Sequence, residues 1–238
     1  MPDLRARQRA GELMDQPDLD PGEHRLALAA LGRANLMSRT AAALWPAIRR
    51  AARTAPSGPL RLLDVATGGG HVAVALARRG AREGIALEIT GIDLSAVAID
   101  YACTLAKSVG VEEVRFQHQD ALNGPWPGEM DVVISTLFLH HLDDDKAVAL
   151  LARMKDAARR LVVVSDLRRS RAGYVLTTIG CRMLSRSRVF RVDGPRSVEA
   201  AFTTDEARAL AAGAGLAGAR LTTHWPARWL LTWTRERE

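Results

Sequence analysis

From residue 60 onward, short apolar runs alternate with stretches of helical periodicity. Near-continuous apolar residues predict buried strands over 60–66, 87–92, 114–118, 131–136 and 161–165. Patterns typical of helices separate them over 71–79, where Gly80 is placed to end the helix, and over 95–108 and 144–159. Strands that alternate with helices indicate a parallel sheet with helices on both faces.

The segments on either side of this region have different patterns. Asp20, Pro21 and Glu23 form a typical helix start, and we expect helices over 21–32 and 34–54, the second kinked by Pro46. The segment 54–59 then breaks the chain.

Near the C-terminus, Thr203 and Glu206 form a capping box that opens a helix over 204–213. Two short runs, 219–223 and 228–234, flank His224-Trp225-Pro226 and predict an antiparallel pair. The fold class we expect is therefore α/β, a doubly wound, mostly parallel seven-stranded sheet with an antiparallel C-terminal hairpin.

Composition and charge narrow the functional classes. At 47% hydrophobic and 25% charged residues, the chain is typical of a soluble globular protein, and it has neither a bilayer-length apolar run nor the apolar core of a signal peptide at its start. We therefore expect a cytoplasmic protein with no transmembrane segment. The two cysteines belong to no CxxC motif and have no neighbouring Cys or His at metal-ligand spacing, which disfavours a cysteine zinc site.

The net charge of +6 leaves a nucleic-acid partner or an anionic surface open. However, only three of the 33 basic residues are lysines, and no basic run carries interleaved aromatics, so an unspecialised solvated face is favoured. No nucleic-acid partner is expected, and a homodimer is an open alternative.

The segment Asp64-Val-Ala-Thr-Gly-Gly-Gly-His71 carries the clearest chemical signal. A predicted strand runs into three glycines before a helix begins, which lets the backbone approach a ligand closely and points helix N–H groups at it. Asp93 closes the next strand, where an acid can accept hydrogen bonds from ribose hydroxyls. A nicotinamide dinucleotide and S-adenosylmethionine both fit this arrangement.

The loop spacing does not separate the two cofactors, because Gly68, Gly70 and Ala73 satisfy the dinucleotide pattern. Asp64 favours the second. A carboxylate would repel a pyrophosphate but attract the ammonium and sulfonium groups of S-adenosylmethionine. A partner arginine within the protein is the alternative for Asp64.

Four motifs in order over residues 60–166 resemble the class I S-adenosylmethionine-dependent methyltransferases, closest in look to bacterial small-molecule enzymes that act on phenolic polyketides and quinones. Asp64, Ala66, Gly68 and Gly70 match their acid and glycine loop, with Ala66 in place of the first glycine. Asp93 falls on the ribose-binding acid, and Gln119-Asp120-Ala121 resembles the adenine-binding segment. Residues 131–142 resemble the fourth motif, whose strand end faces the methionine moiety and the substrate.

The resemblance implies a Rossmann-like methyltransferase fold and S-adenosylmethionine as the cofactor. Residues 1–56 would form an N-terminal helical cap and 57–238 the methyltransferase domain, with 167–203 as a lid-like insertion. The residues expected to bind the cofactor are Asp64, Ala66, Thr67, Gly68, Gly70, Asp93, Leu94, Asp120, Ala121 and Ser135.

Candidate catalytic residues follow the fourth and fifth strands. His140 and His141 stand where the resemblance places the methyl acceptor, and the pKa of histidine suits the removal of a proton from a phenol. A structural role at the helix start near Asp143 is the alternative. Asp166 ends the fifth strand and is expected to act in catalysis or to pair with Arg168 or Arg169.

The insertion supplies candidate acceptor contacts in Arg168, Arg169 and Tyr174, which suit a hydrophobic aromatic molecule with an acidic group. Metal-dependent methyltransferases of the catechol type carry an acid after the fourth strand and Asp-Asn after the fifth. Ser135-Thr136 and Asp166-Leu167 stand there instead, so no metal is expected. The function expected is O-methylation of a phenolic polyketide-like or quinone-like compound, with C-methylation of an activated ring and NAD(P)-dependent oxidoreduction as alternatives.

Overall fold

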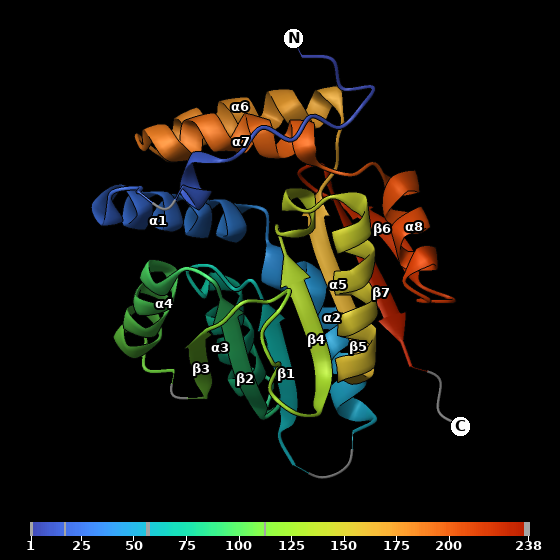
Figure 1. The fold of residues 1–238 in the computed structure, drawn as a ribbon. Coiled ribbons are helices and arrows are strands. Elements are labelled where there is room, and N and C mark those ends of the chain that lie inside the picture. Colours follow the sequence, from blue (N-terminus) through green and yellow to red (C-terminus); the bar gives the residue numbers. More distant parts are fainter. Residues whose placement is uncertain (1, 17, 56–57, 112, 236–238) are drawn as a thin grey trace.

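The computed structural model describes residues 2–16, 18–55, 58–111 and 113–235. A seven-stranded sheet in the order β3-β2-β1-β4-β5-β7-β6 forms its centre (Figure 1). The strands are β1 (Leu60–Val65), β2 (Leu87–Asp93), β3 (Val114–His118), β4 (Met130–Thr136), β5 (Ala158–Leu167), β6 (Arg220–His224) and β7 (Arg228–Thr234). The first five pair in parallel, and β7 pairs antiparallel with both β5 and β6. The predicted fold class is confirmed.

Ten helical elements complete the described part of the chain. The α-helices are α1 (Pro21–Met37), α2 (Thr40–Arg53), α3 (His71–Arg82), α4 (Ala96–Ser108), α5 (Asp144–Ala157), α6 (Arg171–Leu184), α7 (Arg188–Ala200) and α8 (Thr204–Gly213). Two short 3-10 helices are η1 (Leu13–Asp15) and η2 (Leu139–His141). None of the described helices is both long and apolar enough to cross a bilayer.

The alternation of side chains along the strands sorts the helices onto the two faces of the sheet. Leu62 packs with α2 and α3, whereas Leu63 and Val65 pack with α5 and α8. The apolar core on the Leu62 side of the sheet also contains three buried residues of α2, Leu44, Trp45 and Ile48. Helix α2 therefore covers the sheet directly. The expected domain boundary at residues 56–57 lies outside the described residues.

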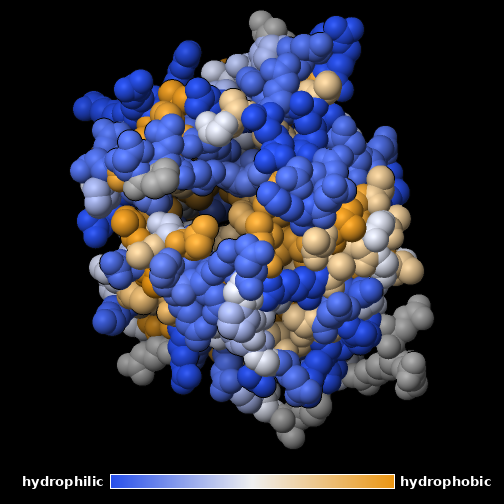
Figure 2. Space-filling view, viewed as in Figure 1, coloured by the Kyte–Doolittle hydropathy of each residue, from blue (hydrophilic) through white to orange (hydrophobic). Residues whose placement is uncertain are grey.

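A further layer lies over the carboxyl ends of the parallel strands. Helices α1, α6 and α7 stack there with the N-terminal segment (Figure 1). Ala27, Ala30, Cys181, Val189 and Phe190 form a separate apolar core that holds this layer together. In the same view the surface is hollowed between this layer and the sheet below it, and apolar residues border the hollow (Figure 2).

Local signals placed some element ends correctly and misplaced others. Asp20 caps α1, Asp143 caps α5, and the Thr203–Glu206 capping box opens α8 as expected. However, α3 continues past Gly80 to Arg82. Gly80 packs against the chain that leads into β2: a Cβ there would lie 2.7 Å from the Ile85 carbonyl oxygen and 3.1 Å from the Leu87 side chain.

The first two helices also differ from expectation, since α1 runs to Met37 and α2 starts only at Thr40. The buried guanidinium of Arg228 fixes their junction. Its Nη1 donates to Thr40 Oγ1 at 2.6 Å and to Asn35 Oδ1 at 3.2 Å. Strand β5 begins three residues earlier than expected, at Ala158, because α5 ends at Ala157.

If α2 is part of the main core, Ile48→Ala should destabilise the protein by about 2–5 kcal/mol, since Ile48 is 0% exposed and its truncation leaves a cavity. Ile179→Ala is the matched control, because Ile179 is 52% exposed and should change stability by about 0.5 kcal/mol or less. Equilibrium unfolding in urea measures both, and equal effects would show that α2 is not packed as described.

Candidate cofactor and active site

The loop after β1 turns through a series of left-handed backbone conformations. Ala66, Gly68 and Gly70 have φ angles of +55°, +55° and +71°. At Gly70 a Cβ would lie 2.6 Å from the Phe116 ring, so only glycine fits against β3. At Gly68 a Cβ would meet nothing within 4 Å, so this part of the loop is open to a ligand.

Asp93, at the end of β2, is hydrogen-bonded to this loop. Its Oδ2 accepts from the Gly68 N–H at 2.8 Å, and its Oδ1 accepts from the Ser95 N–H at 2.9 Å. Burial raises the pKa of Asp93, although these two hydrogen bonds oppose the rise. The glycine loop and the predicted ribose-binding acid are thus brought together at one edge of the sheet.

Asp64 is a buried acid whose hydrogen bonding is incomplete. Its side chain is fully buried, and Thr67 Oγ1 donates to Oδ2 at 2.7 Å, but Oδ1 has no hydrogen-bond partner. Burial, with the nearby Asp93 charge, raises its pKa to about 7. Because a buried acceptor without a partner is costly, the site fits a ligand that brings a donor or a positive charge. The ammonium and sulfonium groups of S-adenosylmethionine meet this requirement.

The other residues expected to contact the cofactor lie nearby along the strand ends. Leu94, next to Asp93, is 67% exposed, and Gln119 N–H donates to the Asp93 carbonyl oxygen, which places Asp120 just beyond. Asp120 accepts from its own turn, through the Leu122 and Asn123 N–H groups and Asn123 Nδ2.

Two more of the expected residues are buried. Ala121 is 6% exposed, and Ser135 Oγ donates to the Val65 carbonyl oxygen, which ties β4 to β1.

Helix α1 covers the start of α3. A Cβ at Gly32 of α1 would lie 2.2 Å from His71 Nε2, so the absence of a side chain at Gly32 makes room for the imidazole. The His71 ring also lies 5.5 Å from the Tyr101 ring, measured between centroids. Burial lowers the pKa of His71, which favours its neutral form.

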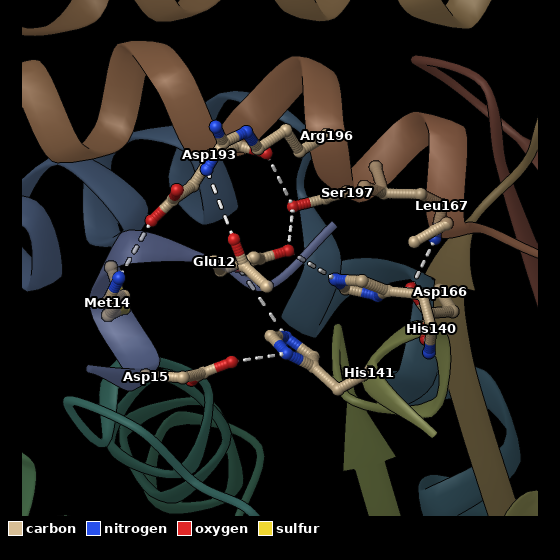
Figure 3. Close-up of polar contacts among 12 residues, drawn as sticks. Glu12, Met14, Asp15, His140, His141, Asp166, Leu167, Asp193, Arg196 and Ser197 are labelled. Atoms are coloured by element: carbon tan, nitrogen blue, oxygen red, sulfur yellow. Dashed lines mark hydrogen bonds and ion pairs between the residues drawn. The ribbon is translucent and has the colours of Figure 1, made fainter. Parts of the chain in front are cut away.

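A second polar cluster lies at the ends of β4 and β5 (Figure 3). His140 Nδ1 lies 2.6 Å from Asp166 Oδ1, and the His140 N–H donates to Asp166 Oδ2 at 3.1 Å. Burial alone would lower the pKa of His140, but the Asp166 and Glu12 carboxylates outweigh it and raise the pKa to about 10. His140 and Asp166, two of the expected catalytic residues, are therefore held together with almost no solvent exposure.

Glu12 completes this cluster and was missed in the sequence. Its Oε1 lies 3.5 Å from His140 Nε2, and its Oε2 lies 3.8 Å from His141 Nε2. Ser197 Oγ of α7 donates to Glu12 Oε1 at 2.5 Å. No local pattern could reveal these contacts, because 128 residues separate Glu12 from His140 along the chain. We call Glu12, His140 and His141, with their partners Asp15, Asp166 and Ser197, the histidine cluster.

His141 is the more accessible of the two histidines. Its side chain is 23% exposed, compared with 3% for His140. Its Nδ1 lies 2.9 Å from Asp15 Oδ2, and its ring stacks on Phe138 with 6.0 Å between centroids. A small cavity of about 80 Å³ is lined by both histidines, Glu12 and Asp15, together with Arg9, Ala10, Gly11 and Ala200.

The expected ion pair between Asp166 and Arg168 or Arg169 is wrong. Asp166 pairs with His140, and the Arg169 guanidinium donates to both Glu206 oxygens, at 2.8 and 2.6 Å. Arg169 is only 5% exposed, so it fastens the insertion to α8. Arg168 and Tyr174 lie at the start of the insertion and are half-buried, and a contact of either with the acceptor stays a prediction.

Comparison with known proteins agrees with this geometry. A family model described as a methyltransferase domain matches residues 62–160. The ubiquinone biosynthesis O-methyltransferase of Psychrobacter arcticus is 30% identical over 129 residues, which make up 53% of this chain and 48% of that protein. The chain thus spans about half the length of the curated relatives it matches.

Solved structures share the fold. An O-methyltransferase family 2 protein from Planctomyces limnophilus, in complex with apigenin, has a TM-score of 0.66 at 18% identity and covers 93% of this chain and 63% of its own. The plantazolicin methyltransferase BpumL, in complex with a triazolic desmethylPZN analogue and SAH, has a TM-score of 0.66 at 16% identity, with 92% of each chain covered.

These matches decide between the two cofactors that the glycine loop left open, because the matched domain is a methyltransferase domain and not a dinucleotide-dependent one. Residues 62–160 thus form a methyltransferase domain, for which S-adenosylmethionine is the methyl donor.

Proposed function

We propose that this protein transfers the methyl group of S-adenosylmethionine to a phenolic hydroxyl of a small, hydrophobic, polyketide-like or quinone-like acceptor. The observation that carries the proposal is the placement of two sites on one edge of the sheet. The glycine loop, with the unpaired Asp64 oxygen, follows β1, and the histidine cluster follows the neighbouring strands β4 and β5. The names of the ubiquinone O-methyltransferase relatives and the apigenin complex of a structural neighbour support a phenolic acceptor.

In this proposal, three acids and the glycine loop hold the cofactor. Asp93 accepts from the ribose hydroxyls, Asp64 attracts the ammonium group, and Asp120 accepts from the adenine amino group. Methyl transfer removes the positive charge of the sulfonium, so the protein mainly has to align donor and acceptor and exclude water. The stacked layer of α1, α6 and α7 covers the strand ends where this alignment takes place (Figure 1).

The acceptor must also lose a proton, because a phenol with a pKa near 10 is only about one part in a thousand ionised at pH 7. We assign the proton to His141, whose Nε2 faces the small cavity of the cluster. His140 and Asp166 are positioning residues for it, since their hydrogen bonds fix η2, which carries both histidines. A cytoplasmic location stays a prediction, as does a homodimer.

The cofactor-binding role of Asp93 predicts that Asp93→Ala weakens S-adenosylhomocysteine binding by about 1–3 kcal/mol, the range for losing a charged hydrogen-bond partner. Isothermal titration calorimetry measures this change. Asp100→Ala, which removes an exposed acid from α4, should bind like the wild type. Unchanged affinity in Asp93→Ala would place the ribose elsewhere.

The raised pKa of Asp64 predicts that cofactor binding depends on pH. Below pH 7 the buried carboxyl is largely protonated in the free protein, whereas a bound ammonium favours the ionised form. Binding should therefore release a proton, and affinity should rise by up to about tenfold per pH unit from pH 5.5 and level off above pH 7.

Titrations in buffers of different ionisation enthalpy count the released protons. Asp64→Asn should show weaker binding that no longer varies over this range. An affinity of the wild type that is flat between pH 5.5 and 7.5 would contradict a direct contact between Asp64 and the ammonium.

The assignment of the proton acceptor predicts that His141→Ala lowers kcat by about 10² to 10⁴ on a reactive phenol found by screening simple phenols and hydroquinones. Its rate should recover as pH rises toward the pKa of the phenol, because the acceptor then ionises without help. Mass spectrometry and NMR of the product locate the methyl group. Methyl on a ring carbon, or an unchanged kcat in the variant, would overturn the assignment.

A further inference from the structure

Three potential ligand atoms of the histidine cluster face one another across the small cavity. His140 Nε2 and His141 Nε2 lie 3.5 Å and 3.8 Å from the two oxygens of Glu12, and all three ligand atoms lie within 4.8 Å of one another. Ligands bound at the usual 2.0–2.1 Å to a tetrahedral metal ion are separated by about 3.3 Å. The observed spacing is too long for good hydrogen bonds, yet small shifts would bring it to that of ligands around one ion.

The opposite ring nitrogen of each histidine is fixed by a carboxylate. Asp166 holds Nδ1 of His140 at 2.6 Å, and Asp15 holds Nδ1 of His141 at 2.9 Å (Figure 3). Ser197 Oγ donates to Glu12 Oε1, the oxygen that faces His140, and so orients the carboxylate. A carboxylate on Nδ1 that leaves Nε2 free for an ion is the usual arrangement around metal-binding histidines. Both histidines of the cluster have it.

Charge and space also suit a cation. Three carboxylates, those of Glu12, Asp15 and Asp166, surround two imidazoles, so the cluster favours a positive charge, either a proton on His140 or a bound cation in its place. Arg9 lies at the cavity, but its guanidinium is turned to Asp143, at 3.8 Å. The cavity of about 80 Å³ has room for an ion and a bound oxygen.

We propose that Glu12, His140 and His141 form a binding site for a divalent transition-metal ion such as zinc. Two imidazoles and one carboxylate suit zinc and its neighbours in the first transition row better than magnesium or calcium, and they leave a coordination position open. The site is distinct from the catechol-type positions that led us to expect no metal, because it depends on Glu12 from the N-terminal segment.

Such an ion deepens the proposed function at the same site, and its role there rests on that function. A hydroxyl oxygen that binds a divalent ion loses its proton at a lower pH, so the ion would take over the task assigned to His141. Metal binding itself needs neither acceptor nor cofactor, so it is measured without them. A failure of metal binding would leave the methyl-transfer proposal standing. A failure of methyl transfer would likewise leave the metal-site proposal standing.

The test is equilibrium dialysis of the purified 238-residue chain against zinc, followed by elemental analysis. We expect one zinc ion per chain, and Glu12→Gln and His141→Ala should weaken its binding on the order of 100-fold or more. Asp15→Asn, which removes a partner of a ligand, should weaken it by about 10- to 100-fold. Cobalt(II) as a second probe should give visible absorption bands that His141→Ala removes.

His118→Ala is the matched control, because His118 is an exposed histidine outside the cluster and its loss should leave zinc binding unchanged. Circular dichroism of each variant confirms folding, and the more exposed His141 is chosen over His140 for this reason. Zinc binding that is equal in the wild type, Glu12→Gln and His141→Ala would assign it to surface groups. That result, or no zinc binding by the wild type, would overturn the proposal.

Discussion

The carboxylate of Asp93 is the link on which the cofactor half of the structure depends. It joins the loop after β1 to the end of β2 by accepting the Gly68 N–H, and it caps the turn into α4 by accepting the Ser95 N–H. The loop passes through three left-handed residues, and of these only Ala66, which is not a glycine, is strained unless neighbouring contacts hold it. Asp93 therefore keeps the loop open at Gly68 in the absence of any ligand.

The two polar sites on this edge of the sheet differ in how completely they are satisfied. Asp64 is buried with an oxygen that has no hydrogen-bond partner, whereas His140 and Asp166 bond to each other and to the backbone. An unsatisfied buried acid lowers stability and favours a ligand that supplies what is missing. A satisfied pair fixes the orientation of the side chains next to it. The arrangement at Asp64 suits the binding of a ligand, and the arrangement at His140 and Asp166 suits the positioning of neighbouring side chains.

The sequence predicted those features that depend on neighbours along the chain. Strand and helix periodicity and the caps at Asp20, Asp143 and Thr203 follow from local rules. The placement of Asp93 beside the glycine loop could also be predicted, because the carboxyl ends of neighbouring parallel strands meet at one edge. Gly80 was misread because its missing side chain makes room for Ile85 and Leu87, while the helix itself ends two residues later, at Arg82.

Contacts across the chain could not be predicted in the same way. Glu12 meets His140, Arg169 meets Glu206, and Arg228 meets Thr40 through side chains that only the folded chain brings together. Each of these arginines and acids has many possible partners in a sequence with 33 basic and 27 acidic residues. Tertiary packing selects one partner, and no spacing rule encodes that choice.

The histidine cluster is built from parts of the chain that lie on both sides of the matched methyltransferase domain. That domain spans residues 62–160 and contains both histidines, whereas Glu12, Asp15 and Ser197 come from outside it. Substitutions in the N-terminal segment or in α7 can therefore reshape the histidine cluster while the glycine loop after β1 stays intact. If the cluster receives the acceptor, as proposed, new acceptor preferences can evolve while the methyl donor is retained.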